Sequence, residues 1–401
     1  MPEVPPFDPA STLHFVINSR SGSQDGDGTR ATIEAALNGE HRQRLPGNWS
    51  PVARYLDPAR HQRELAALRR LPQAVADAAA LQASGDWLAR SVHGVPVLLT
   101  RHADGQLRVF INVCRHRGAA LVPEGACGQG RERFVCPYHS WTYGNDGACI
   151  GRPHDRDFPH APKATSGLVE LPCAQRFGLV WVVASALPAF DWAAYFGPLG
   201  EEIDGLGFDT AARVQRHRRF TQASNWKLVL DANLESYHFA YAHRETIAYL
   251  FHDNVVVHDQ LGDHQRIVLP KRSFEELSEP PATLEGFAKT INTIYFLFPS
   301  TLLLWEGDHI NAFALSPTDA ATTQVDGWLI APRQHLATRS DSYWQRNFDM
   351  FWTAIDEDFA LAASMQRGLD SGANQALCFG ENEFACEAFH ASVQRMAGEG
   401  A

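Results

Sequence analysis

Two short motifs, each with one cysteine and one histidine, constrain the fold of this chain more than any other feature. The first is Cys114-Arg-His116 and the second is Cys136-Pro-Tyr-His139. Thiolates and neutral imidazoles are strong metal ligands, and one centre can use all four only where two loops meet. The pattern therefore predicts a metal centre held between two loops.

The pairing of these ligands favours an iron–sulfur cluster over zinc. Zinc fingers usually pair cysteine with cysteine and histidine with histidine, whereas each motif here supplies one of each. In a Rieske [2Fe-2S] centre two cysteines hold one iron and two histidines hold the other. The flanking residues resemble the two-loop signature of Rieske proteins: Arg115, Arg117, Gly118, Pro137 and Trp141. We expect the four ligands to bind such a cluster, and a structural zinc site is the alternative.

Composition narrows the class of protein. A chain of 401 residues is long enough for two domains, and 45% hydrophobic with 20% charged residues is an ordinary globular composition. A net charge of -11 argues against nucleic acid as a partner. We expect no membrane span, because the apolar stretches are short. The start of the chain lacks the pattern of a signal peptide and the remaining cysteines are scattered, so we expect a cytoplasmic protein.

The pattern along the chain predicts four regions. Residues 1–45 are rich in Pro, Gly, Ser and Asp and form a peripheral extension, and residues 46–74 hold a helical segment that we expect to pack on the domain formed by residues 191–401. Residues 75–190 contain short apolar runs joined by turns such as Asp104-Gly105, which is typical of a small all-β domain. Residues 191–401 combine aromatic-rich strands with long helical patterns, which indicates an α+β domain.

A second candidate centre lies in the larger domain. His238 and His243 follow an acidic segment, and two histidines with one carboxylate form the facial triad of non-haem Fe(II) enzymes. A separation of five residues puts them about 140° apart on a regular helix, so one of them must lie where a helix ends or bends. The third ligand is expected among Asp356, Glu357 and Asp358. Asp358 lies about 65° from the centre of the apolar helix face, Asp356 about 95° and Glu357 about 165°. We favour Asp358, and Glu357 fits a solvated acidic patch best.

Together the segments Asn225-Trp-Lys, Glu235-x-x-His238 and His243 resemble Rieske non-haem iron oxygenases of the aromatic ring-hydroxylating α-subunit type. The resemblance implies a helix-grip (START-like) catalytic domain with a central antiparallel sheet and a long C-terminal helix, assembled as a homotrimer with or without a β-subunit. It also implies that Glu235 bridges His238 to a cluster histidine of the next subunit, where Asp is more usual. Asp231 is the alternative bridge.

The resemblance predicts a terminal oxygenase that inserts oxygen from O2 into a small organic substrate, aromatic or otherwise apolar. Electrons come from NAD(P)H through a separate reductase, with or without a ferredoxin, since no dinucleotide-binding fingerprint occurs here. Three alternatives remain: a monooxygenase or demethylase acting on a quaternary ammonium compound, an electron carrier without oxygenase activity, and a zinc-stabilised interaction protein. Aromatic side chains on the strands either line the substrate pocket or form core: Tyr295, Phe296, Phe298, Trp305 and Phe313.

Overall fold

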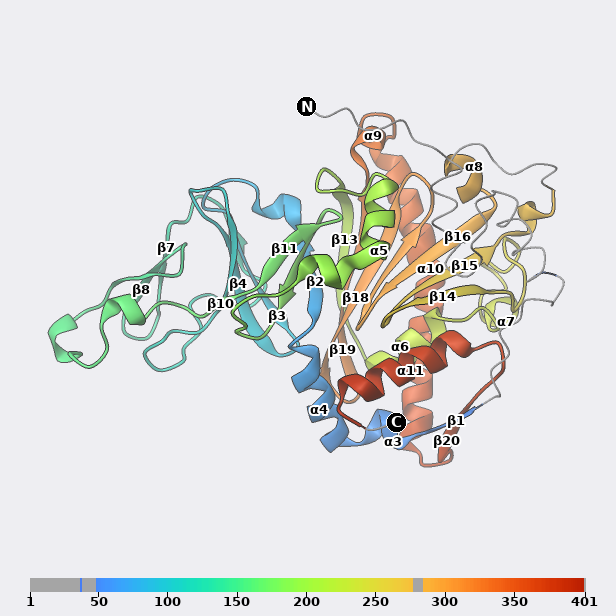
Figure 1. The fold of residues 1–401 in the computed structure, drawn as a ribbon, viewed down its shortest axis with the longest axis horizontal. Helices are drawn as coiled ribbons and strands as arrows, with labels where there is room; N and C mark the ends of the chain where they lie inside the picture. The colour runs from blue at the N-terminus through green and yellow to red at the C-terminus, as the bar shows by residue number, and fades with distance from the viewer. Residues whose placement is uncertain (1–36, 38–47, 277–283, 400–401) are drawn as a thin grey trace. The chain divides into compact units, whose positions relative to one another are not determined.

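The computed structural model describes residues 37, 48–276 and 284–399, and it divides the chain into two compact units. The smaller unit is Leu65–Tyr195, and the larger is Met1–Glu64 together with Phe196–Ala401 (Figure 1). The extension predicted for residues 1–45 lies, apart from Leu37, outside the described residues. The smaller unit begins before the predicted residue 75, because strand β2 at Pro72–Asp77 pairs with a strand of that unit.

The smaller unit is built from short antiparallel strands, as the turn-rich sequence predicts. Its five-stranded sheet has the order β10-β5-β4-β3-β6, a three-stranded sheet has the order β11-β12-β2, and the strands β7-β8-β9 form a third sheet. The remaining bounds are β3 Trp87–Val92, β4 Val95–Arg101, β5 Leu107–Ile111, β6 Cys127–Gly128, β7 Arg133–Val135, β8 Thr142–Gly144, β9 Cys149–Gly151, β10 Glu170–Leu171, β11 Cys173–Arg176 and β12 Leu179–Val183. Loops between these strands carry the cysteine and histidine motifs.

A turn at Gly147 fixes the connection between β8 and β9 to the core of the smaller unit. Gly147 has a φ of 82°, which is a left-handed conformation that favours glycine. A Cβ atom at this position would lie only 2.4 Å from the ring of Phe110. The turn therefore packs tightly against β5, the strand that leads to Cys114.

A seven-stranded antiparallel sheet forms the centre of the larger unit, in the order β13-β19-β18-β17-β16-β15-β14. The strands are β13 Arg213–Gln222, β14 Val257–Leu261, β15 His264–Pro270, β16 Ile291–Leu297, β17 Thr301–Trp305, β18 Ile310–Asp319 and β19 Thr322–Ala331. The apolar run from Thr293 to Leu304 divides into two strands around Pro299, which cannot donate a ladder hydrogen bond. β1 Asn48–Pro51 and β20 Ala376–Phe379 form a separate two-stranded sheet.

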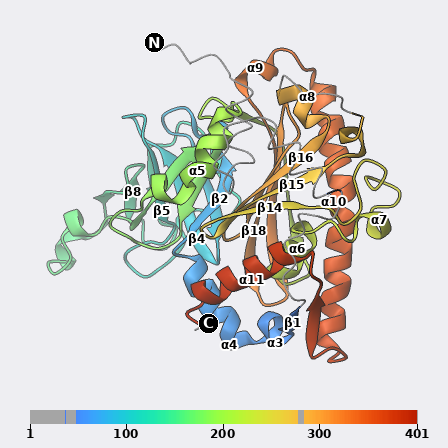
Figure 2. The ribbon, with the colours of Figure 1, turned by 45° about the vertical axis from the view of Figure 1, so that its right-hand side comes forward.

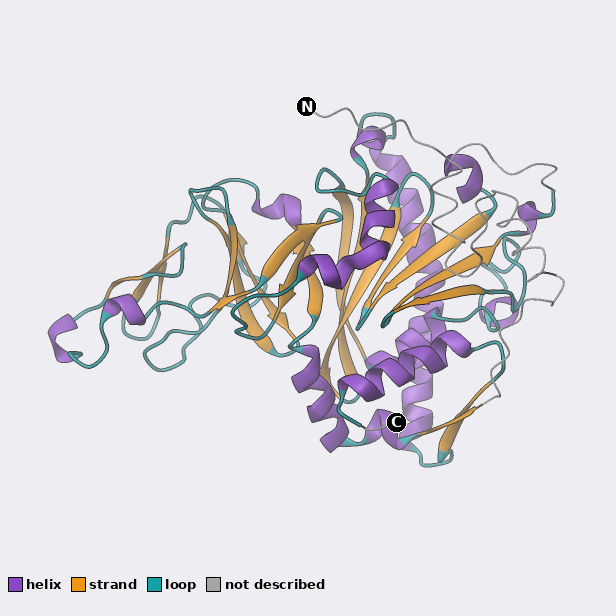
Figure 3. Cartoon of the chain, viewed as in Figure 1, coloured by secondary structure: helices purple, strands orange, loops and turns teal. Residues whose placement is uncertain are grey.

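Helix α10, Asp341–Asp370, packs along this sheet and is the longest helix in the described part of the chain (Figures 2 and 3). The Ser340 side chain caps its first turn by accepting a hydrogen bond from the Tyr343 amide. The others are α3 Ala53–Leu56, α4 Pro58–Leu68, α5 Trp192–Gly205, α6 Trp226–Asn233, α7 Phe239–Ala242, α8 Leu284–Ala288, α9 Arg333–Leu336 and α11 Phe384–Met396. The described residues contain no helix that is long and apolar enough to cross a membrane.

Helix α10 approaches the sheet most closely at Gly327 of β19. A Cβ atom built on Gly327 would lie 1.9 Å from the ring of Trp352, which is in the middle of α10. Trp352 in turn stacks on Phe359, which lies on the same face of α10 about two turns further along. The missing side chain at Gly327 lets an aromatic helix face lie flat on the strand, and this contact positions the segment that carries Asp358.

Candidate functional sites

The two cysteine and histidine motifs lie on facing loops of the smaller unit. Cys114 follows β5, and its loop closes through hydrogen bonds from the Cys114 amide to Ala119 O (2.8 Å) and from Gly118 N to Cys114 O (2.9 Å). Cys136 follows β7, and its amide donates to Trp141 O at 2.8 Å. Both thiols are buried, whereas the two imidazoles are partly exposed.

One nitrogen of each histidine in these loops is buried. The rings of His116 and His139 lie 4.7 Å apart, and His116 stacks on Trp141. Nδ1 of each histidine is buried and has no hydrogen-bond partner within residues 48–276 and 284–399. Arg117 contacts His139 Nε2 at 2.8 Å. If Nδ1 held a metal, Nε2 would keep the proton, and because a guanidinium can only donate, Arg117 would have to turn away. Unpartnered nitrogens beside buried thiols fit the ligand set of a Rieske cluster.

The second centre is built around the one-turn helix α7. Helix α6 ends at Asn233, His238 directly precedes α7, and His243 directly follows it. Both imidazoles therefore lie at helix ends, which lets residues five apart in sequence face each other, with 3.1 Å between their Nε2 atoms. This geometry agrees with the expectation that at least one histidine lies at a helix terminus.

Asp358 of α10 meets the two histidines. Its Oδ1 lies 3.0 Å from His243 Nε2 and 3.4 Å from His238 Nε2, and the three ligand atoms lie within 4.8 Å of one another. Asp358 is only 3% exposed, and no described residue forms a regular hydrogen bond with its Oδ1. A carboxylate and two imidazole nitrogens that converge without donors are a suitable site for a divalent cation.

The carboxylates and imidazoles of this cluster shift one another's pKa values. Burial alone lowers the pKa of His238, but the nearby carboxylates of Asp358 and Glu235 outweigh burial and raise it to about 10. The pKa of His243 is also raised, because Asp358 and Glu357 overcome the effect of burial. Burial favours the neutral acid at Asp358, yet both histidines hold its pKa below the usual value. If His238, His243 and Asp358 hold a metal ion, the ion would replace the protons that the raised pKa values keep on the two imidazoles.

Acidic side chains orient both histidines. Glu235 hydrogen-bonds His238 Nδ1, as the predicted bridge requires on its own subunit, and Glu357 accepts from His243 Nδ1 at 2.6 Å. Thr246 also donates to Glu357, at 2.7 Å. The expectation that Glu357 belongs to a solvated patch was therefore wrong, because its long side chain reaches round the helix to His243. No signal in the sequence of α10 alone indicates this contact.

The other two candidate acids have different partners. Asp356 is exposed and pairs with Arg218 at 2.9 Å. The carboxylate of Asp231 is buried, and it accepts hydrogen bonds from Tyr55 Oη at 2.7 Å and from His390 Nε2 at 2.8 Å. Tyr55 comes from the N-terminal segment, so this network joins α3, α6 and α11 within the larger unit.

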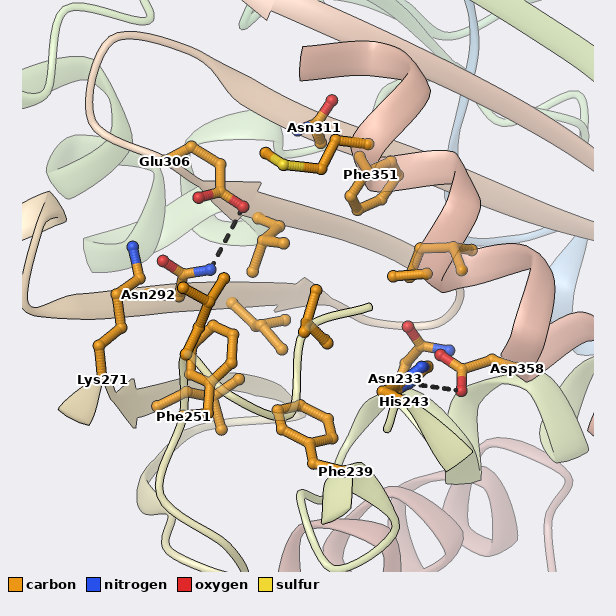
Figure 4. Close-up of a pocket in the computed structure, with 18 of the residues that line it drawn as sticks. Asn233, Phe239, His243, Phe251, Lys271, Asn292, Glu306, Asn311, Phe351 and Asp358 are labelled. Carbon is orange, nitrogen blue, oxygen red and sulfur yellow. Dashed lines mark hydrogen bonds and ion pairs between the residues drawn. The ribbon is translucent and has the colours of Figure 1, made fainter. Parts of the chain in front are cut away.

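A cavity of ≈ 190 Å³ adjoins the His–His–Asp cluster. In Figure 4 the labelled side chains His243, Asp358 and Asn233 lie at one end, and Lys271, Asn292 and Glu306 lie at the other. The wall between them is mainly apolar: Phe239, Ile247, Leu250, Phe251, Leu269, Ile294, Leu304, Met350, Phe351, Ala354 and Ile355. The cavity therefore links a candidate metal centre to a polar far end.

The aromatic residues proposed from the sequence as pocket lining do not line this cavity. Tyr295 alternates with the lining residue Ile294 and instead donates a hydrogen bond to Glu202, at 2.7 Å. Phe313 packs against Trp352 and Phe359 of α10. Phe296, Phe298 and Trp305 are likewise buried core. The strand pattern predicts alternation, but it does not identify which face holds the cavity.

Both charged groups at the far end are perturbed by burial. Burial raises the pKa of Glu306, an effect that Lys271 and His309 oppose. Burial lowers the pKa of Lys271, which Glu306 opposes. The sequence analysis missed both residues, although a carboxylate directly after the apolar strand β17 and a lysine directly after β15 are unusual enough to be noticed.

Two family models match the chain over most of its described length. The Rieske [2Fe-2S] domain model matches residues 72–166, and the model of the ring hydroxylating alpha subunit (catalytic domain) matches residues 208–399. These ranges contain all seven candidate ligands.

Similar proteins and solved structures agree with both models. Choline monooxygenase of Spinacia oleracea is 30% identical over 338 residues, which is 82% of this chain and 72% of the relative. The glycine betaine monooxygenase oxygenase subunit of Chromohalobacter salexigens is 26% identical, covering 74% and 73%.

Two solved structures share the fold. A quaternary ammonium Rieske monooxygenase in complex with L-carnitine has a TM-score of 0.73 at 20% identity, covering 89% of this chain and 97% of that one. Naphthalene 1,2-dioxygenase from Rhodococcus sp. has a TM-score of 0.71 at 17% identity, covering 93% and 99%. The chain belongs to the Rieske non-haem iron oxygenase alpha-subunit family, the oxidoreductases that incorporate molecular oxygen.

Proposed function

We propose that this chain is a terminal monooxygenase that acts on a small quaternary ammonium compound, with electrons from NAD(P)H delivered by a separate reductase. The observation that carries the substrate class is the cavity beside His243 and Asp358. It combines a buried carboxylate, Glu306, with the phenyl rings of Phe239 and Phe251. A quaternary ammonium has no N–H group, so it is held by negative charge and aromatic faces. The relatives that act on choline and glycine betaine support this class.

The residues of the chain have distinct roles in this proposal. The Cys and His motifs would hold the [2Fe-2S] cluster, and His238, His243 and Asp358 would hold the iron. When bound, these groups supply electron transfer and oxygen activation. Glu235 keeps a proton on His238 Nδ1 and so leaves Nε2 free to act as a ligand. Glu357 does the same for His243.

Glu235 has a second role in the proposal. We propose that it also contacts a cluster histidine of the neighbouring subunit in a homotrimer and so completes the path for electrons. Asp231 is the weaker candidate for that bridge, because Tyr55 and His390 already occupy its carboxylate. Its hydrogen bonds suit it to holding α6, the helix that precedes His238.

A product screen tests the proposed function. The protein, loaded with iron and cluster and supplied with NADH, O2 and a surrogate reductase, is offered choline, glycine betaine, L-carnitine, naphthalene and indole. We expect substrate-dependent O2 consumption and an oxidised or demethylated product from a quaternary ammonium compound. Turnover of the aromatic compounds alone would overturn the substrate class. Reduction of the cluster without product from any compound would support the electron carrier instead.

A further inference from the structure

The far end of the cavity contains a cation and a carboxylate that do not pair with each other. Lys271 Nζ donates one hydrogen bond, to Ala288 O at 2.6 Å, although an ammonium has three donors. Among the described residues no carboxylate lies within ion-pair distance of Lys271. Glu306 accepts from Asn292 Nδ2 at 3.2 Å. Both charges line the same cavity, so a ligand can lie between them.

Two buried side-chain oxygens line the same cavity. Asn292 and Asn311 are 5% and 2% exposed, and neither Oδ1 atom has a hydrogen-bond partner among the residues that the structure describes. A buried acceptor left unpaired costs free energy, so these oxygens favour a ligand with a positive surface. The polarised methyl groups of a quaternary ammonium provide such a surface through C–H···O contacts, without an N–H donor.

The charges of the cavity discriminate between quaternary ammonium compounds. Glu306 and the two amide oxygens favour the positive group, but Lys271 repels a ligand that is only cationic. A ligand that also carries a carboxylate gives Lys271 a partner. The two charges of the ligand then balance those of Glu306 and Lys271, so the four charges sum to zero. Burying a charge is costly unless it is paired, so the second charge contributes to binding.

We propose that Lys271 is a specificity-determining residue, which binds the carboxylate of a zwitterionic substrate while Glu306, Asn292 and Asn311 surround its quaternary ammonium group. The substrate class is therefore a betaine, with both charges on one small molecule, rather than a choline-type cation. This inference rests on the proposed function and deepens it, because it assigns one charge of the substrate to one residue.

Binding measurements test this assignment without relying on turnover. Calorimetric titration of the iron- and cluster-loaded full chain is carried out with glycine betaine, with choline, and with 3,3-dimethylbutanoate, the uncharged-carbon isostere of glycine betaine. Lys271→Met keeps the side-chain length and removes the charge. We expect it to weaken glycine betaine about thirtyfold, as for one partner of a buried charge pair, and not to weaken choline. Glu306→Gln is expected to weaken both trimethylammonium ligands and to spare the isostere.

Control variants separate charge recognition from folding. Lys289→Met removes an exposed lysine nearby and should leave all three affinities unchanged. Lys271→Arg keeps the charge and should restore part of the preference for glycine betaine. Cluster absorbance and iron content are checked for every variant.

Two results would overturn the assignment. If Lys271→Met weakens choline and glycine betaine equally while iron and cluster remain, Lys271 has only a structural role and the proposed function still stands. If the unaltered protein binds and oxidises no quaternary ammonium compound, the proposed function fails first, and the assignment of Lys271 fails with it.

Discussion

The two candidate metal sites are built in different ways. The cluster loops take four ligands from residues 114–139, and local turns hold them. The second centre combines His238 and His243 with Asp358, which lies more than a hundred residues further along on α10. A local motif can be recognised from spacing alone, whereas a centre between distant segments depends on helix packing. The local environments differ too: within the described part of the chain no carboxylate contacts the cluster imidazoles, whereas carboxylates contact both imidazoles of the second centre.

The largest expected effect comes from removing one ligand at each site. Asp358→Ala should abolish oxygenation and leave the visible spectrum of the cluster intact, because the two sites lie in separate units. Cys136→Ser should remove the cluster spectrum and still allow Co²⁺ to bind beside His238. Absorption spectra and metal analysis check both variants. Loss of the cluster signal in Asp358→Ala would contradict two independent sites.

Glu357→Gln should give a smaller effect, confined to the second centre. The amide accepts the hydrogen bond from His243 Nδ1 less strongly, and carboxylates that orient a metal-binding histidine typically contribute about 10–100-fold in metal affinity. Competition for Co²⁺ with a chelator measures the change. Asp356→Asn is the matched control, since Asp356 precedes Glu357 on α10 and its exposed carboxylate pairs with Arg218 rather than with a histidine. Equal losses in both variants would show that helix charge, rather than the contact with His243, matters.

The smallest expected change, about tenfold for each pH unit, is a difference in pH dependence between the two centres. With a pKa of about 10, His238 in the metal-free protein is protonated throughout the neutral range, so a metal ion must displace that proton. Co²⁺ affinity should therefore rise with pH by about tenfold per unit between roughly pH 7 and 9. Burial, together with Arg117 and His116, lowers the pKa of His139, so this ligand is already neutral there. A flat Co²⁺ profile would show that His238 does not carry the proton.

The sequence predicted which residues meet at each candidate site better than it predicted what surrounds them. The angular position on α10 was enough to favour Asp358 over Asp356, because burial of a carboxylate follows directly from the apolar face. The same reasoning misplaced Glu357, since a helical angle locates a Cβ atom and not the end of a flexible side chain. The position of the cavity could not be predicted either. The alternation of strand residues leaves two possible faces of the sheet, and only the packing of α10 decides which of them lines the cavity.

The close approach at Gly327 also links a remote backbone position to the metal-binding geometry. Trp352, which lies over Gly327, is six residues before Asp358, about 9 Å along the helix axis. The histidines belong to a different segment, around α7. A methyl group at position 327 would lift α10 from the sheet and carry the carboxylate away from two imidazoles that stay behind. The distance between the carboxylate and the imidazoles therefore depends on the absence of a side chain at position 327.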